Sequence, residues 1–195
     1  MNGFRRLGAS LILAGLGIPL SPAFSQTDGQ FTLTGSFTYS YDQLQHGSTT
    51  FTAGSLEGGD IVSSSRSPLS PEGRTFLKAD EDIPIYTRPR SPLFPEGQTF
   101  LKACAVFSEE SPGGLNLKAP CTFTEAQEDG GDQLFAVAIR KQGDIGDVNR
   151  GGTGHADLVG GTGKYADITG HCSYETRYLS ASTAATTWDC TWSQS

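Results

Sequence analysis

The chain lacks several features that would place it in a familiar functional class. Its only methionine is the initiator, it has three histidines, and its 14 Lys+Arg are outnumbered by 21 Asp+Glu, for a formal charge of −7. This acidic balance argues against a nucleic acid or an anionic membrane as partner, because neutralising phosphate requires clustered Lys and Arg. After the first 25 residues no apolar run approaches the roughly 18 residues of a membrane-spanning helix. We therefore expect no nucleic-acid partner and no membrane partner.

Motifs that hold cofactors or metals are missing as well. Gly160-Gly-Thr-Gly-Lys164 lacks both the leading glycine and the Ser/Thr after lysine that a phosphate-binding loop requires. Residues 151–157 are one residue out of register with the calcium-binding nonapeptide repeat, which occurs in arrays. The nucleophile motif Gly-x-Ser-x-Gly is absent, and no two cysteines have zinc-ligand spacing. The sequence predicts no cofactor and no metal, and it identifies no catalytic residue.

The first 25 residues are typical of a secretory signal peptide. Residues 2–6 carry two arginines, residues 7–20 are apolar, and Ala23-Phe24-Ser25 places small residues at the positions that define a cleavage site. Removing this segment leaves one domain, residues 26–195, whose formal charge is −9 because two arginines are lost. We therefore predict a secreted or periplasmic protein.

The mature part is predicted to be all-β. Residues 31–41 alternate aromatic or aliphatic with hydroxylated side chains, which is the period-2 pattern of a half-buried strand. The turn signals we assign are residues 45–47, Gly58-Gly59, residues 128–131 and Gly151-Gly152. The further strands expected between them are residues 49–56, 60–65, 99–108, 115–124, 132–141, 154–159, 165–179 and 184–192. Eight or nine strands at this spacing predict an antiparallel barrel or sandwich. Closure into a single antiparallel β-barrel of about eight strands would remove the exposed edges, so we expect the barrel.

The four cysteines predict two disulfide bonds. Cys104, Cys121, Cys172 and Cys190 all follow the signal peptide, and an even number in an exported chain favours bridges over metal binding. Three connectivities are open, but the pairs 104–121 and 172–190 each straddle a turn signal, which favours these two. Each bridge would close a loop of fewer than about 20 residues and contribute about 3 kcal/mol.

Pairing Cys172 with Cys190 fixes a register for the last hairpin. Tyr174 then faces Trp188, and Gly170 faces Trp192 on the same side, where an aromatic ring covers a strand glycine. The opposite face carries His171, Glu175, Arg177 and Asp189, which we interpret as exposed polar pairs. Most of these aromatic rings are expected in the core, and Tyr174, Trp188 and Trp192 are candidates for stacking on a ligand.

A tandem duplication interrupts the regular spacing of strands. Residues 66–79 recur as residues 90–103 at a period of 24, with 12 of 14 columns identical. Two copies are too few for a solenoid, and only the second copy continues into an apolar strand. We interpret residues 66–89 as an inserted duplicate of the 90–113 region. A proline-rich recognition arm is the functional alternative.

Residues 156–170, Ala-Asp-Leu-Val-Gly-Gly-Thr-Gly-Lys-Tyr-Ala-Asp-Ile-Thr-Gly, resemble a motif of the dirigent and allene oxide cyclase-like β-barrels. The chain is also similar to small exported bacterial proteins that share this barrel. In those families a strand ends in Val-Gly-Gly-Thr-Gly-Lys-aromatic, which corresponds here to Gly160, Gly161, Gly163, Lys164 and Tyr165. Gly170 then allows a bend in the next strand, and Asp167 stands where those families commonly have glycine. The resemblance implies a structural turn, a barrel interior that binds apolar molecules, and a homo-oligomer.

These observations favour a non-enzymatic protein that holds a small apolar or aromatic ligand in its barrel, or a purely structural role. No catalytic motif of the resembled families can be matched residue by residue, so no active site is transferred. A dirigent- or cyclase-like isomerase that uses interior carboxylates is the first alternative. The second alternative is a protein-interaction module that uses the 66–89 arm.

Overall fold

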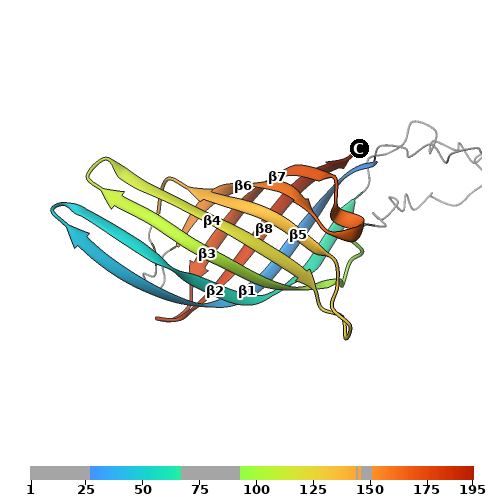
Figure 1. Ribbon diagram of the computed structural model, residues 1–195, viewed down its shortest axis with the longest axis horizontal. Coiled ribbons are helices and arrows are strands. Elements are labelled where there is room, and N and C mark those ends of the chain that lie inside the picture. The colour runs from blue at the N-terminus through green and yellow to red at the C-terminus, as the bar shows by residue number, and fades with distance from the viewer. Residues whose placement is uncertain (1–26, 67–92, 144, 146–150) are drawn as a thin grey trace, which may run out of the picture.

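The computed structural model describes residues 27–66, 93–143, 145 and 151–195, and these form one closed antiparallel barrel (Figure 1). Each strand pairs with its neighbours in sequence, and the last strand pairs with the first. The strands are β1 (Thr27–His46), β2 (Thr49–Arg66), β3 (Thr99–Ser111), β4 (Gly114–Glu125), β5 (Gln133–Arg140), β6 (Gly151–Gly161), β7 (Ile168–Tyr178) and β8 (Thr183–Gln194). The predicted all-β barrel of about eight strands is confirmed. The predicted signal peptide and residues 67–92 of the duplication lie outside the described residues.

The alternation of side chains along β1 sorts them between the interior and the solvent. Phe31, Leu33 and Phe37 are buried, whereas Thr32 is half-buried and Thr34 exposed. This follows from the strand period of two, which sends successive side chains to opposite faces of the sheet. The same pattern holds around the ring, so the core of the protein is the interior of the barrel.

Two of the expected turn signals lie in strands: Gly58-Gly59 is in the middle of β2, and Gly151-Gly152 forms the start of β6. Gly58 pairs with Phe37 on β1 and with Lys102 on β3, in the middle of β2. A Cβ atom at Gly58 would lie 2.1 Å from the carbonyl oxygen of Ser36, so this glycine allows close approach of two strands rather than a reversal. Gly151-Gly152 likewise begins β6 and pairs with β7. Glycine alone does not distinguish a turn from a close backbone contact.

Uninterrupted pairing makes the first two hairpins long. The hairpins β1–β2 and β3–β4 extend well past the β7–β8 connection at the same end of the barrel (Figure 1). We call this end, which carries the turns after His46, Ser111, Arg140 and Tyr178, the hairpin end. The opposite end carries the connections β2–β3, β4–β5 and β6–β7.

Both predicted disulfide bonds are present, with the favoured connectivity. Cys104 and Cys121 join β3 to β4 with Cα atoms 4.1 Å apart, and Cys172 and Cys190 join β7 to β8 at 4.0 Å. All four side chains are buried on the inner face of the barrel. The two bridges indicate folding in an oxidising compartment.

The predicted register of the last hairpin is also confirmed. Cys172 pairs with Cys190, Tyr174 with Trp188, and Gly170 with Trp192, all on the inner face. The rings of Tyr174 and Trp188 stack with centroids 4.9 Å apart. The cross-strand disulfide therefore lies in a row of large aromatic side chains that fill this side of the core.

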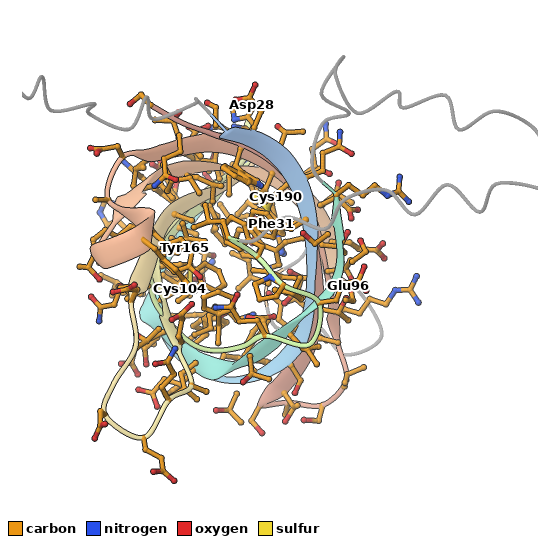
Figure 2. The ribbon with its side chains drawn as sticks, turned by 90° about the vertical axis from the view of Figure 1, so that its right-hand side faces the viewer. Asp28, Phe31, Glu96, Cys104, Tyr165 and Cys190 are labelled. Carbon is orange, nitrogen blue, oxygen red and sulfur yellow. A yellow bond between two sulfur atoms is a disulfide. The ribbon has the colours of Figure 1, made fainter. Side chains whose placement is uncertain are left out.

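Residues 93–98 close the end of the barrel opposite the hairpin end, and we call them the plug. Phe94 has no exposed surface; its ring stacks on Phe31 with centroids 3.8 Å apart and on Tyr165 at 5.3 Å. Trp192 meets the same ring edge-on at 5.6 Å. Figure 2 looks into this end, with the green segment crossing the opening and Phe31 and Tyr165 inside the ring of strands.

One buried carboxylate fastens the plug to the barrel. Glu125, at the end of β4, accepts hydrogen bonds from the hydroxyl of Tyr165 at 2.7 Å, from the amide of Gln127 at 2.8 Å and from the amide of Gln98. The ammonium of Lys164 lies 2.5 Å from the same carboxylate. Because these donors come from three different connections, Glu125 ties the plug to the loops on both sides of it.

None of the described residues form a helix long and apolar enough to cross a bilayer.

Candidate functional site

A cavity inside the barrel, towards the hairpin end, is the best candidate for a functional site. Its wall includes the Cys104–Cys121 bridge and apolar side chains of β2 to β5, among them Val106 and Leu117. All the lining residues are buried except Tyr41 and Leu56, which are partly exposed. The polar lining residues are Tyr41, Lys102, Arg140, Tyr174, Thr176, Tyr178, Thr186 and Trp188. The cavity therefore approaches solvent beside Tyr41 and Leu56.

The size of the cavity limits what it can hold. Its volume is about 40 Å³, whereas sites that enclose a whole drug-sized ligand are roughly 300–1,000 Å³. At about 10–15 Å³ for each water position, it has room for roughly three waters or a chemical group of similar size. It can enclose the polar head of a small molecule, and the remainder would lie against Tyr41 and Leu56.

Lys102, in the cavity wall, forms a buried ion pair with Asp60. The ammonium of Lys102 donates to Asp60 at 3.1 Å and lies 2.8 Å from its second carboxylate oxygen, and it also donates to the hydroxyl of Thr186 at 2.9 Å. The side chains are 1% and 0% exposed, and the ring of Phe37 lies 5.0 Å from the ammonium. Burial raises the pKa of Asp60 and lowers the pKa of Lys102, while their mutual attraction opposes both shifts.

Aromatic hydroxyls and a guanidinium occupy the part of the wall nearest the hairpin end. The guanidinium carbon of Arg140 lies 5.5 Å from the centre of the Tyr174 ring. Burial raises the pKa of the Tyr174 hydroxyl, and Arg140 opposes the shift. Burial likewise raises the pKa of Tyr41, with Tyr178 adding to the effect. These phenols therefore remain protonated hydrogen-bond donors across the physiological pH range.

The predicted ligand-stacking residues separate into two groups. Tyr174 and Trp188 line the cavity, and they are stacked on each other. Trp192 does not line it; its ring packs under Phe94 at the plugged end. Two of the three predicted stacking residues, Tyr174 and Trp188, therefore lie together at the cavity. The third, Trp192, packs at the closed end of the barrel.

The glycine-rich motif forms the β6–β7 connection. Gly160 and Gly163 have φ of +112° and +51°, which other residues rarely adopt, while Gly161 continues β6. A one-turn 3-10 helix over Gly163–Tyr165 then carries Tyr165 into the interior, where it contacts Phe94. The amide of Lys164 donates to the carboxylate of Asp132 at 3.1 Å. The motif therefore positions Tyr165 in the interior. Its backbone N–H at Lys164 is already bonded to the side chain of Asp132.

The histidines stay outside this site. His171 lies on the outer face, with Nδ1 2.6 Å from Asp157 on β6 rather than beside Asp189. Both side chains of this pair are largely exposed, and the ring of His155 lies 6.2 Å away. Within the described part of the chain, no three or more His, Cys, Asp or Glu side chains come together as a metal site.

Asp60, Lys102 and Arg140 are not among the residues singled out from the sequence. Each of them stands in phase with inward-facing apolar neighbours, as Lys102 does between Phe100 and Cys104, and Arg140 after Ala136 and Ala138. The sequence does show a charged residue at a strand position where the alternation predicts an inward-facing apolar side chain. Such a residue requires a polar partner inside the barrel. The partner itself depends on strand register, which the sequence pattern does not provide.

The fold and the cavity place the chain among closed, up-and-down eight-stranded β-barrels with an apolar core and a small interior cavity. Comparison with protein-family models, with curated proteins and with solved structures finds no match for the chain.

Proposed function

We propose that this protein is a non-enzymatic binding barrel that holds a small apolar or aromatic molecule by its polar head. The observation that supports this proposal is the interior cavity, in which a few hydrogen-bonding groups converge among aromatic and aliphatic walls. Small-molecule sites commonly combine such apolar walls with a few polar groups that orient the ligand. The stacked rings of Tyr174 and Trp188 form part of the aromatic wall of this cavity.

The same proposal includes export and the resemblance to the dirigent and allene oxide cyclase-like barrels. Two disulfide bonds agree with a secreted or periplasmic location, to which the signal peptide would direct the chain. Both resembled families bind apolar compounds inside the barrel, which is the use proposed here for the cavity. A homo-oligomer is implied by the resemblance alone.

The proposal is tested with three small aromatic probes: benzyl alcohol, benzamide and benzoate. We expect at least one to quench the fluorescence of Trp188, read in a Trp192→Phe variant, and to raise the melting temperature. Filling the cavity with Ala138→Leu should abolish both effects, whereas Ala105→Leu on the outer face should preserve them. If no probe shifts either signal, or if Ala138→Leu binds normally, the cavity is not a ligand site.

A second candidate function is supported by the buried carboxylate of Asp60. A carboxyl group beside a lysine, next to a cavity, can move protons in an isomerase or cyclase of the resembled kind. The variant that discriminates between the two functions is Asp60→Asn with Lys102→Met, which removes both charges together. Ligand binding without turnover in the wild-type protein would favour the binding barrel, and turnover that this double variant loses would favour the enzyme.

A further inference from the structure

The polar groups in the cavity wall are strongly biased towards hydrogen-bond donors. Lys102, Arg140 and the indole of Trp188 can only donate, and the remaining polar lining groups are tyrosine and threonine hydroxyls, which can do both. Of the described lining residues, none carries a carboxylate or a side-chain amide. A ligand that complements this wall must therefore supply acceptors.

Trp188 and Trp192 both bury an indole N–H without a hydrogen-bond partner among the described residues, and of the two only Trp188 lines the cavity. Its side chain is buried, and its Nε1–H has no hydrogen-bond partner among the described residues. Leaving a buried donor unsatisfied costs about 1–3 kcal/mol, and buried indoles normally find a partner. A phenylalanine would stack on Tyr174 without that cost, so the N–H is explained if an acceptor enters the cavity beside it.

The charges in the wall favour an anionic acceptor. Two cationic side chains, Lys102 and Arg140, face the cavity, and both are buried. Asp60, which pairs with Lys102, does not line the cavity. Inside a barrel with little water, a negative group is attracted to such cations more strongly than it would be at the surface.

We propose that the cavity is a carboxylate-binding site and that the ligand class is small aromatic or apolar carboxylic acids. This inference rests on the proposed binding function and specifies its head group. A carboxylate has three heavy atoms, which matches a volume of about 40 Å³. Its two oxygens can take a forked pair of hydrogen bonds from a guanidinium and still accept from the indole N–H.

The test compares acids with their neutral amides of nearly the same shape. Binding of benzoate and benzamide, and of acetate and acetamide, is measured by calorimetry and by the shift in melting temperature. We expect each acid to bind about tenfold or more tightly than its amide, as a charged hydrogen bond predicts. Equal affinity for acid and amide, or a preference for the amide, overturns the carboxylate inference while the binding function survives.

Two substitutions assign the preference to this cavity. Trp188→Phe removes the indole N–H and should weaken benzoate about tenfold while leaving benzamide within about twofold. Arg140→Met should remove most of the preference for the acid, and Trp192→Phe, at the plugged end, should change neither affinity. Should Arg140→Met fail to fold, the Trp188→Phe result decides alone. Benzoate binding that Trp188→Phe leaves unchanged overturns the proposal, and the absence of binding by all four probes overturns the binding function as well.

Discussion

The two copies of the duplication differ at two positions, and in the second copy these positions hold the residues that fasten the plug. The second copy has Phe94 and Gln98 where the first has Ser70 and Arg74. Phe94 fills the end of the barrel, and Gln98 donates to the hydroxyl of Tyr165 at 3.0 Å and to the carboxylate of Glu125. Conversely, the first copy carries neither the ring nor the amide that this end of the barrel uses.

Replacing Phe94 by the residue of the other copy should therefore open the plug. Phe94→Ser removes a fully buried ring and leaves a hydroxyl among Phe31, Tyr165 and Trp192. We expect the free energy of unfolding to fall by about 3–5 kcal/mol, measured by urea denaturation. The matched control is Leu101→Ser, because Leu101 is 61% exposed on the outer face of β3 and should change stability by less than about 0.5 kcal/mol. Similar losses for both variants would contradict the assignment of residues 93–98 as a plug.

Residue patterns predicted the disulfides well and the interior charges poorly, for a physical reason. The pairing of Cys172 with Cys190 follows from local spacing around one tight turn, and the facing of Tyr174 and Trp188 follows from it. The contact of Lys102 with Asp60 requires the register between β2 and β3, which are separated in sequence by the duplicated segment. A lysine on an apolar phase indicates that a partner exists without indicating which residue it is.

At the scale of elements, strands were predicted more reliably than the turns between them. Residues 45–47 and 128–131 do lie at reversals, whereas Gly58-Gly59 and Gly151-Gly152 lie inside strands. The difference lies in the partner strands: the carbonyl of Ser36 lies against Gly58, and the carbonyl of Thr176 lies against Gly151. Those contacts arise only when the sheet has formed, so the glycine pairs alone predicted a break within β2 and a late start for β6.

The duplication itself predicts that one copy can be removed without harm to the barrel. Deleting residues 66–89 joins Ser65 directly to Arg90, and the new junction reads Ser-Arg-Ser-Pro-Leu-Phe, with one intact copy. Within the described part of the β2–β3 connection, Phe94 and Gln98 contact the barrel, and the deletion retains both. We expect the shortened protein to unfold cooperatively, with a melting temperature within a few degrees of the full chain, since the entropy of closing a loop changes only slowly with its length.

The measurement for that deletion is circular dichroism during heating, together with mass mapping of the two disulfide bonds. A control deletion of the same length, residues 75–98, removes Phe94 and Gln98 and leaves Ser70 at the plug position. It should lower the melting temperature markedly, because the aromatic contacts of the plug are lost. Collapse of the fold in the 66–89 deletion would mean that the first copy is a structural part of the barrel.

For the molecule as a whole, the number and spacing of strands predicted a barrel or a sandwich and the removal of exposed edges favoured closure, but the sequence did not predict how the interior is filled. A closed sheet of eight strands leaves an interior that side chains can just fill, so the size of any cavity is a small remainder after packing. Here that remainder lies where Ala119 and Ala138 pair across β4 and β5, opposite the larger rings of β7 and β8. Such a balance of volumes depends on all strands together, and no local pattern specifies it.

The buried phenols make the stability of the whole barrel sensitive to alkaline pH. Burial raises the pKa of Tyr41, Tyr165 and Tyr174, and the hydrogen bond to Glu125 adds to the shift of Tyr165. A raised folded pKa means that the folded barrel keeps these protons when the unfolded chain, with tyrosine pKa values near 10, releases them. The protonated tyrosines therefore make their full contribution to the free energy of unfolding below a pH of about 10. That contribution is lost as the pH rises towards and through the raised pKa values, by up to about 1.4 kcal/mol per pH unit for each tyrosine.

Urea unfolding between pH 8 and pH 11.5 tests this dependence, with tyrosinate absorbance recorded on the same samples. We expect a flat free energy of unfolding below pH of about 9.5 and a steep decline above it, with most of the tyrosinate absorbance appearing only as the protein unfolds. Tyr174→Phe should make the decline of the free energy of unfolding with pH less steep, by up to about 1.4 kcal/mol per pH unit, which corresponds to one proton. The ring stays stacked on Trp188 and only the ionisable hydroxyl is lost. Full titration of the tyrosines near pH 10 in the folded protein would show instead that solvent reaches these hydroxyls, and the interior would then be an open channel rather than a small closed cavity.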